Sequence, residues 1–216
     1  DNGQDGRCLF DINGTVSLAL SGDGSADGYA LTATAGSTTV TSQLHLKPSQ
    51  FTSLAFTYDG SGKSWIHLMA PDSLGHIASE QLFDNVALTW TADQAGVMTI
   101  GTTCDTLRSM RGYIDDVRLF TRQLSTSDIE KNYNHYMGGT ESDLVAYWSF
   151  DEPISTLRRA YDYSSTGSTA NENHAKVMAA QRNSDIRPTT EQLALFSLTD
   201  SDGHYTIQSI PYANSG

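Results

Sequence analysis

Lysine, glutamate, cysteine and long hydrophobic runs are all scarce in this chain. The 216 residues include four lysines and six glutamates, and the formal net charge is −12 at pH 7. A chain with this acidic balance lacks the basic field that attracts phosphate backbones, so we expect no nucleic-acid partner. No stretch approaches the roughly 20 apolar residues of a membrane span, so we expect no insertion into a membrane.

Two cysteines, Cys8 and Cys104, are too few for a four-thiolate zinc site. They are either two buried thiols or one disulfide. In the chain-entropy model, a disulfide that closes so long a loop contributes about 4–5 kcal/mol. The sequence leaves both alternatives open.

Short runs of alternating apolar and polar residues, separated by Gly, Asp and Ser, dominate the chain. In the first run, Val16, Leu18 and Leu20 would share one face of a strand. Residues 59–62 (DGSG) are a hairpin-turn signal. The expected strands are residues 15–20, 29–34, 39–46, 51–58, 64–69, 86–90, 97–101, 112–120 and 144–152. Strands at this spacing predict an antiparallel β-sandwich or jelly roll.

One helix interrupts the strands. Ser125 is a typical N-cap residue, and Asp128 follows it at the third position of a capping box. From Ile129 to Tyr136, apolar residues recur at helical spacing, and the glycine pair at 138–139 would end the helix. We therefore expect a single helix of about three turns.

Three segments carry longer motifs. They read SLAFTYDG at 53–60, RGYIDDVRLFTRQLS at 111–125 and LVAYWSFDE at 144–152, the last accompanied by YDYSS at 161–165 and NHA at 173–175. Together they resemble the laminin-G-like jelly rolls of the concanavalin A-like lectin/glucanase superfamily, over most of residues 7–180. The resemblance implies an all-β fold, an antiparallel jelly-roll β-sandwich with one short helix.

The motifs stand in an unusual order. A typical member of that family begins with the LVAYW strand and ends with the IDDVR strand, whereas here IDDVR comes first. The chain holds either parts of two jelly rolls or one sandwich built from both halves. A lone half would leave an apolar face and unpaired edges in water. We therefore favour one sandwich, in which the strand around Tyr147 pairs with the strand around Val117.

The last residues suggest a second module. The segment TDSDGHYTI at 199–207, with IPY at 210–212, resembles the opening hairpin of carboxypeptidase-regulatory-like modules. The resulting interpretation assigns residues 1–183 to the jelly roll, with its strand order permuted, and residues 184–216 to a linker and the start of a second β module. Such modules occur along large bacterial surface proteins, so the resemblance implies a multidomain extracellular chain.

The pattern of acidic residues argues against catalysis. Glucanases of the resembled superfamily place two glutamates on one strand, so that the two carboxylates lie about 5 Å apart. No two glutamates of this chain lie within five residues of each other. Asp115 and Asp116 are adjacent, and on a strand their side chains would point to opposite faces. We therefore expect no enzyme activity.

Calcium is the cofactor that the resemblance suggests. Related jelly rolls often carry a structural calcium near the IDDVR strand and the loop that here runs from YDYSS at 161–165 to NHA at 173–175. The matching positions are Asp162, Asn173 and Asp116, with Asp151 nearby in the LVAYWSFDE segment. The alternative is that such side chains form local turns through bonds to the backbone. Asp115 or Asp116 could equally form an ion pair with Arg118 or Arg111.

The resemblance implies a non-catalytic extracellular module that binds carbohydrate or mediates adhesion within a larger bacterial cell-surface protein. Its partner would be a glycan or a cell-surface ligand, and the module would be monomeric. Aromatic side chains that stack on sugars are candidates for the site, and the sequence does not choose among them. They are Trp65, Trp90, Tyr113, Trp148 and Tyr161. The alternatives are a structural spacer without a ligand and an accessory domain of a polysaccharide-degrading enzyme.

Overall fold

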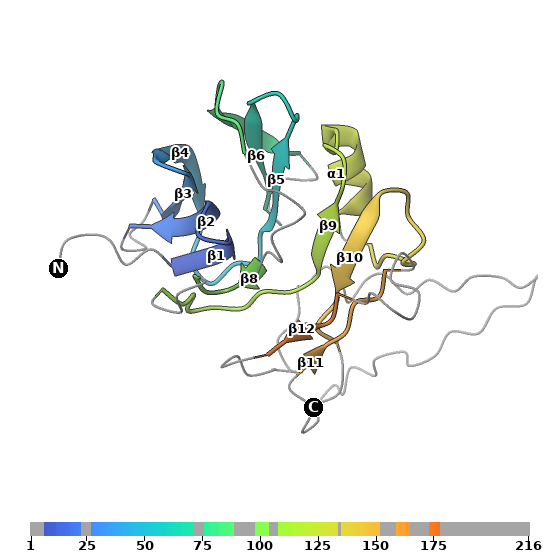
Figure 1. The fold of residues 1–216 in the computed structure, drawn as a ribbon. Helices are drawn as coiled ribbons and strands as arrows, with labels where there is room; N and C mark the ends of the chain where they lie inside the picture. The colour runs from blue at the N-terminus through green and yellow to red at the C-terminus, as the bar shows by residue number, and fades with distance from the viewer. Residues whose placement is uncertain are drawn as a thin grey trace, which may run out of the picture.

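The computed structural model describes residues 7–22, 27–70, 76–88, 98–103, 108–133, 135–151, 159–164 and 173–177. These residues form antiparallel β-sheets and one short helix (Figure 1). The expectation of an all-β antiparallel sandwich with one helix is therefore confirmed. Among the described residues, no helix has the length and apolar character that a membrane crossing needs. The proposed second module, residues 184–216, lies outside the described residues.

A five-stranded sheet, in the order β4-β3-β2-β1-β8, forms one layer of the sandwich. Its strands are β1 (Arg7–Ile12), β2 (Val16–Ser21), β3 (Tyr29–Ala35), β4 (Thr38–Leu46) and β8 (Met98–Ile100). Val16, Leu18 and Leu20 are buried and alternate with less buried neighbours, as the sequence predicts. Strand β1 was not predicted, because the buried Asp11 interrupts its apolar pattern. The Asp11 carboxylate accepts a hydrogen bond from the backbone N–H of Gly14.

Cys8 on β1 is 1% exposed. Its thiol donates a hydrogen bond to the carbonyl oxygen of Phe10, with an Sγ–O distance of 3.2 Å. Cys104 lies outside the described residues, so the two alternatives, two buried thiols or one disulfide, both stand as the sequence left them.

A three-stranded sheet packs against the first one. It consists of β5 (Ser53–Tyr58), β6 (Ser64–Met69) and β7 (Ala78–Phe83), in that order. Ile66, Leu68 and Leu82 face inward and share a core cluster with residues of β2 and β3. The predicted turn at 59–62 is confirmed, because the Asp59 carboxylate accepts hydrogen bonds from the N–H groups of Ser61 and Lys63 at 2.8 and 2.9 Å.

Strand β7 corrects the sequence-based prediction, which placed a strand at residues 86–90 instead. The segment ASEQLF of β7 is largely polar, and its pattern is broken by Glu80 on the inward face. The Glu80 carboxylate accepts hydrogen bonds from the N–H groups of Gln43 and Leu44 on β4. Residues 86–88 form no strand, although Val86 and Leu88 still pack against the core.

The two halves of the chain meet where β9 (Val117–Phe120) pairs with β10 (Leu144–Trp148). In this antiparallel pair Arg118 lies opposite Tyr147, and Val117 lies opposite Trp148, so the predicted pairing is confirmed. Strand β9 is shorter than the expected strand at 112–120. Ala146 and Trp148 form a second core cluster with Ala160 of β11 (Arg159–Ala160), which pairs with β12 (Ala175–Lys176).

Helix α1 (Thr126–Asn132) begins as predicted and ends earlier than predicted. Ser125 and Asp128 form the expected capping box. The helix stops at Asn132 rather than at the glycine pair, because the guanidinium of Arg118 donates hydrogen bonds to the carbonyl oxygens of Asn132 and His135 at 2.6 and 2.5 Å. These bonds satisfy carbonyls near the helix end without a further helical turn.

Replacing Leu144 with Ala tests how much the burial of β10 stabilises the fold. Leu144 is completely buried, and we expect the free energy of unfolding to fall by about 2–5 kcal/mol. The half-buried Val145 on the same strand is the matched control, and Val145→Ala should cost less. Denaturant unfolding followed by circular dichroism measures both values. Two separate unfolding transitions in the unmodified chain would contradict a single sandwich.

Candidate functional site

The three-stranded sheet presents polar and aromatic side chains on the face that points away from the core. Along β6, Ile66 and Leu68 face the core, so Trp65 and His67 face outward. The strand register places Trp65 opposite Thr57 of β5, and His67 opposite Ser79 of β7. These side chains therefore share one outer surface.

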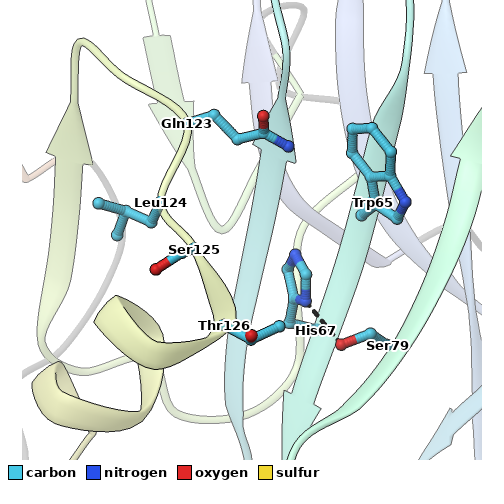
Figure 2. Close-up of a pocket in the computed structure, with 7 residues that line it drawn as sticks. All are labelled: Trp65, His67, Ser79, Gln123, Leu124, Ser125 and Thr126. Atoms are coloured by element: carbon cyan, nitrogen blue, oxygen red, sulfur yellow. Dashed lines mark hydrogen bonds between the residues drawn. The ribbon is translucent and has the colours of Figure 1, made fainter.

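The segment between β9 and α1 turns this surface into a recess of about 440 Å³ (Figure 2). From the segment, the Gln123 side chain extends toward the side of β6 that carries Trp65 and His67. The lining residues are Trp65, His67, Ser79, Gln123, Leu124, Ser125 and Thr126.

Ion pairs and the capping box hold this covering segment in place. The guanidinium of Arg122 contacts the carboxylates of Asp128 at 2.9 Å and Asp143 at 3.2 Å. The hydrogen bond from Arg122, together with those from the hydroxyl and backbone N–H of Ser125, lowers the pKa of Asp128 to about 2. The segment is thus anchored on both sides of Gln123, whose side chain remains exposed.

His67 forms the floor of the recess and is 6% exposed. Its Nε2 lies 3.1 Å from the Thr57 hydroxyl, and its Nδ1 lies 2.8 Å from the Ser79 hydroxyl. Burial lowers the pKa of His67, so the ring is neutral at neutral pH. A neutral imidazole donates from one nitrogen and accepts at the other, so both hydroxyls are oriented by the same ring.

The recess combines a half-buried indole ring with amide and hydroxyl groups. Trp65 offers an aromatic surface, and the Gln123 amide can both donate and accept hydrogen bonds. Ser79 and Thr126 add hydroxyls to the lining. Such a surface suits a ligand with one apolar face and a rim of polar groups.

Among the described residues, no carboxylate lines the recess. Glu80 of the adjacent strand points to the opposite face, where its Oε2 accepts a hydrogen bond from the Ser42 hydroxyl at 2.6 Å. Asp115 and Asp116 precede β9, and Asp116 has a φ of 59°. Our prediction that they occupy opposite faces of a strand is therefore wrong, but Asp116 forms the anticipated ion pair with Arg118.

Asp162, the first predicted calcium ligand, is bonded to the backbone. Its Oδ1 accepts hydrogen bonds from the N–H groups of Tyr147 and Ser164, both at 2.9 Å, and its Oδ2 accepts one from Asn173 at 3.2 Å. Burial raises the pKa of Asp162, but these donors outweigh burial and hold the pKa below its usual value. The carboxylate thus links β10 to the segments around β11 and β12.

Of the other predicted ligands, the structure brings only Asn173 to Asp162. The Asn173 side chain donates to the carbonyl oxygen of Val145 at 3.2 Å. Asp116 is held by Arg118, and Asp151 is exposed after the end of β10. Within the described part of the chain, no group of three or more His, Cys, Asp or Glu residues is placed to hold a metal ion. Residues 165–172 lie outside that part, and calcium stays a prediction.

Of the candidate aromatics that the structure describes, Trp65 alone lines the recess. Trp148 belongs to the second core cluster, as the sequence indicated. Tyr113 is 53% exposed, Tyr161 packs edge-on against His174, and Trp90 lies outside the described residues. Sequence reasoning missed His67, although its position two residues after Trp65 on one strand was a usable signal. It also missed Gln123, which no local pattern marks.

The sequence matches a known family over residues 1–130, described as the concanavalin A-like lectin/glucanases superfamily. Among solved structures, the chain is similar to a Bacteroides ovatus protein proposed to bind carbohydrate, with a TM-score of 0.53 and 19% sequence identity. The similarity covers 81% of this chain and 48% of that chain, so this chain spans about half the length of the other protein. At this identity the similarity shows the fold alone. No curated protein has a significantly similar sequence.

Replacing Asp162 with Ala tests its role as a structural acceptor. The change leaves three backbone N–H groups without their acceptor, and we expect the free energy of unfolding to fall by about 2–3 kcal/mol. If the role is purely structural, the loss is the same in excess calcium and in EDTA. A calcium site would instead show as a melting temperature of the unmodified chain that EDTA lowers. Thermal melts of both chains in both buffers separate these outcomes.

His67 predicts a defined pH dependence of stability. Its pKa in the folded chain lies below the usual 6.5, so as the pH falls the unfolded chain takes up the proton first. The contribution of His67 to the free energy of unfolding is therefore complete above pH 6.5. It is lost as the pH falls through the pKa that His67 has in the folded chain. His67→Gln does not titrate and should remove this part of the pH profile. Melting temperatures of both chains across this pH range measure the difference, and parallel profiles would contradict the assignment.

Proposed function

Because the chain belongs to the concanavalin A-like lectin/glucanase superfamily, we propose that it is a non-catalytic carbohydrate-binding module whose ligand is a glycan. The observation that carries this proposal is the recess in which the Trp65 ring lies beside the Gln123 amide and the hydroxyls of Ser79 and Thr126. Aromatic rings and planar polar groups are the usual partners of sugars in proteins.

The geometry suggests how a sugar would bind. The apolar C–H face of a pyranose ring would stack on Trp65, and its hydroxyls would exchange hydrogen bonds with the Gln123 amide and the hydroxyls of the lining. The volume of about 440 Å³ lies within the range of about 300–1,000 Å³ for ligand pockets. The recess therefore has room for one unit of a longer glycan. Because His67 already orients Ser79, part of the polar surface is ordered before the ligand arrives.

The lining supports binding rather than hydrolysis. Retaining and inverting glycosidases both need a pair of carboxylates on either side of the scissile bond. In the described part of the chain, neither Asp nor Glu lines the recess, and the Glu80 carboxylate is bonded to β4 on the other face of its sheet. We accordingly propose no enzyme activity for this module.

We also propose that the module works outside the cell, as a monomeric unit of a larger bacterial surface protein that adheres to glycans. The acidic charge of −12 suits a soluble unit that avoids nucleic acid. The resemblance of residues 199–212 to the start of a further β module supports a multidomain chain.

A glycan array followed by titration of the bound sugars tests the proposal. We expect weak binding, and Trp65→Ala should reduce the affinity at least about tenfold, which corresponds to the loss of about 1.4 kcal/mol of stacking. Gln123→Ala should weaken binding by a smaller factor. Tyr163→Ala is the matched control, because it removes an exposed aromatic ring outside the recess and should leave binding unchanged.

The other outcomes each contradict part of the proposal. An array without signal for any glycan would favour the structural spacer. Glycan binding that survives Trp65→Ala in a folded chain would place the sugar elsewhere. Binding confined to the substrate of a neighbouring catalytic domain would identify an accessory domain of a polysaccharide-degrading enzyme.

A further inference from the structure

Three polar side chains on the outer face of the three-stranded sheet form a hydrogen-bonded chain that ends in the recess. The hydroxyl of Thr57 on β5 lies 3.1 Å from Nε2 of His67, and the hydroxyl of Ser79 on β7 lies 2.8 Å from Nδ1 of the same ring. Figure 2 marks the second of these bonds. His67 and Ser79 line the recess, whereas Thr57 does not. Thr57 therefore affects the recess through the ring of His67.

The burial of Thr57 decides which nitrogen of His67 carries the proton. Thr57 is 6% exposed, and among the described residues its hydroxyl has one hydrogen-bond partner, Nε2 of His67. If Nε2 carried the proton, it would donate to Thr57, and the hydroxyl hydrogen of Thr57 would be buried without an acceptor. In folded proteins a buried donor without an acceptor is rarer than an oxygen with an unused lone pair. The Thr57 hydroxyl therefore donates to Nε2, and the neutral ring carries its proton on Nδ1.

This tautomer fixes the role of Ser79. Its hydroxyl oxygen accepts the hydrogen bond from Nδ1, so the ring does not use the hydroxyl hydrogen. Ser79 is exposed on β7, and no other described residue bonds to its side chain, so this hydrogen is available to a ligand. In the other tautomer Ser79 would donate to the ring and would offer a ligand only lone pairs. His67 thus makes Ser79 a hydrogen-bond donor.

The rest of the recess offers few acceptors to a ligand. Among the described residues, no carboxylate lines it, and the Ser125 oxygen already accepts a hydrogen bond from the N–H of Asp128. A sugar hydroxyl that accepts from Ser79 still carries a hydrogen that needs an acceptor of its own. A carbonyl or carboxylate oxygen carries no hydrogen and makes no such demand. The recess therefore favours a ligand that presents one of these oxygens to Ser79.

Charge decides between the carbonyl and the carboxylate. The formal net charge of the chain is −12, and within the described part of the chain neither Lys nor Arg lines the recess. A carboxylate would lose its water without gaining a cation, and the chain as a whole would repel it. A neutral amide carbonyl incurs neither cost. The methyl group of an acetamide also suits the apolar surfaces that Trp65 and Leu124 add to the lining.

We propose that the recess selects sugars that carry an N-acetyl group, whose carbonyl oxygen accepts a hydrogen bond from the Ser79 hydroxyl. This inference rests on the proposed function, because it names the class of glycan that the same recess binds. His67 is a positioning residue, which sets the direction of the Ser79 hydroxyl. Thr57 in turn sets the tautomer of His67.

The tautomer can be measured without any glycan. In a chain labelled with ¹⁵N-histidine, a ring nitrogen that carries a proton and one that does not have well-separated ¹⁵N chemical shifts. The chain has six histidines, and the signals that disappear in the His67→Gln variant belong to His67. At a pH above the pKa of His67, we expect the protonated nitrogen to be Nδ1. A proton on Nε2, or equal amounts of the two forms, would overturn the proposal.

Titration calorimetry with matched oligosaccharides tests the ligand class. Oligomers of N-acetylglucosamine and of glucose differ only at C2, as do those of N-acetylgalactosamine and galactose. In at least one pair, we expect the N-acetylated sugar to bind about tenfold more tightly, which is the worth of one neutral hydrogen bond. An oligomer of glucuronic acid, which offers a carboxylate instead, should bind more weakly than the N-acetylated sugar.

Variants of two residues test the cause of this preference. Ser79→Ala removes the donor, so the ratio of the two affinities should fall toward one. Ser79→Thr is the matched control, because it keeps a hydroxyl at the same strand position and should retain most of the ratio. His67→Phe keeps an aromatic ring without the nitrogens that orient Ser79, so the ratio should fall there as well. If His67→Phe does not fold, the two Ser79 variants and the ¹⁵N spectrum still decide the question.

The outcomes separate this inference from the proposed function. Equal affinity within both pairs, or tighter binding of the glucuronic acid oligomer, would overturn this inference and leave a glycan site in place. Persistence of the preference in a folded Ser79→Ala chain would also overturn it, because the carbonyl would then have another donor. Absence of binding to every glycan would overturn the proposed function and this inference together.

Discussion

The pairing of β9 with β10 is the constraint on which the rest of the structure depends. It joins the IDDVR segment to the LVAYW segment, which follows it in the chain. Leu144, Ala146 and Trp148 are 0, 1 and 6% exposed in the paired state. Burying a side chain the size of Leu contributes about 1.5–3 kcal/mol, so separating the two strands would expose a large part of the second core cluster. The Asp162 carboxylate adds polar bonds to the same strand, by accepting from the N–H group of Tyr147.

Arg118 connects the β9–β10 pair to helix α1, whose first residue lines the proposed glycan site. From β9 its guanidinium bonds to the carbonyls of Asn132 and His135, pairs with Asp116 and lies 5.6 Å from the centre of the Tyr147 ring. The end of α1 is therefore fixed to the β9–β10 pair. The start of α1 is fixed by the Ser125 capping box and by the ion pair between Arg122 and Asp128. Gln123 lies between β9 and this fixed helix start, so the position of the recess is set by strand register.

Features that depend on neighbours in sequence could be predicted, and features that depend on distant partners could not. The turn at Asp59 and the cap at Ser125 rest on residues two to four positions away, and both were correct. Strand β7 was missed because Glu80 is satisfied by β4, whose sequence lies 36 to 38 positions earlier. The end of α1 was wrong because it is set by Arg118. Trp65 was a candidate from its residue type, but only the fold brings Gln123 to it.

On the outer face of β6, the polar residue His67 occupies a buried position that an apolar side chain could fill without hydrogen-bond partners. His67 is almost fully buried, and burial of an imidazole is unfavourable unless both of its nitrogens are bonded. Two hydroxyls from two different strands, Thr57 and Ser79, meet this requirement. A valine at position 67 would need neither hydroxyl. Local departures of this kind are expected where a chain serves a ligand rather than its own stability, and here the departure lies beside the exposed Gln123 amide and the Trp65 ring. A neutral ring with both nitrogens bonded also keeps Ser79 in one orientation, which would lower the ordering cost of binding at the proposed glycan site.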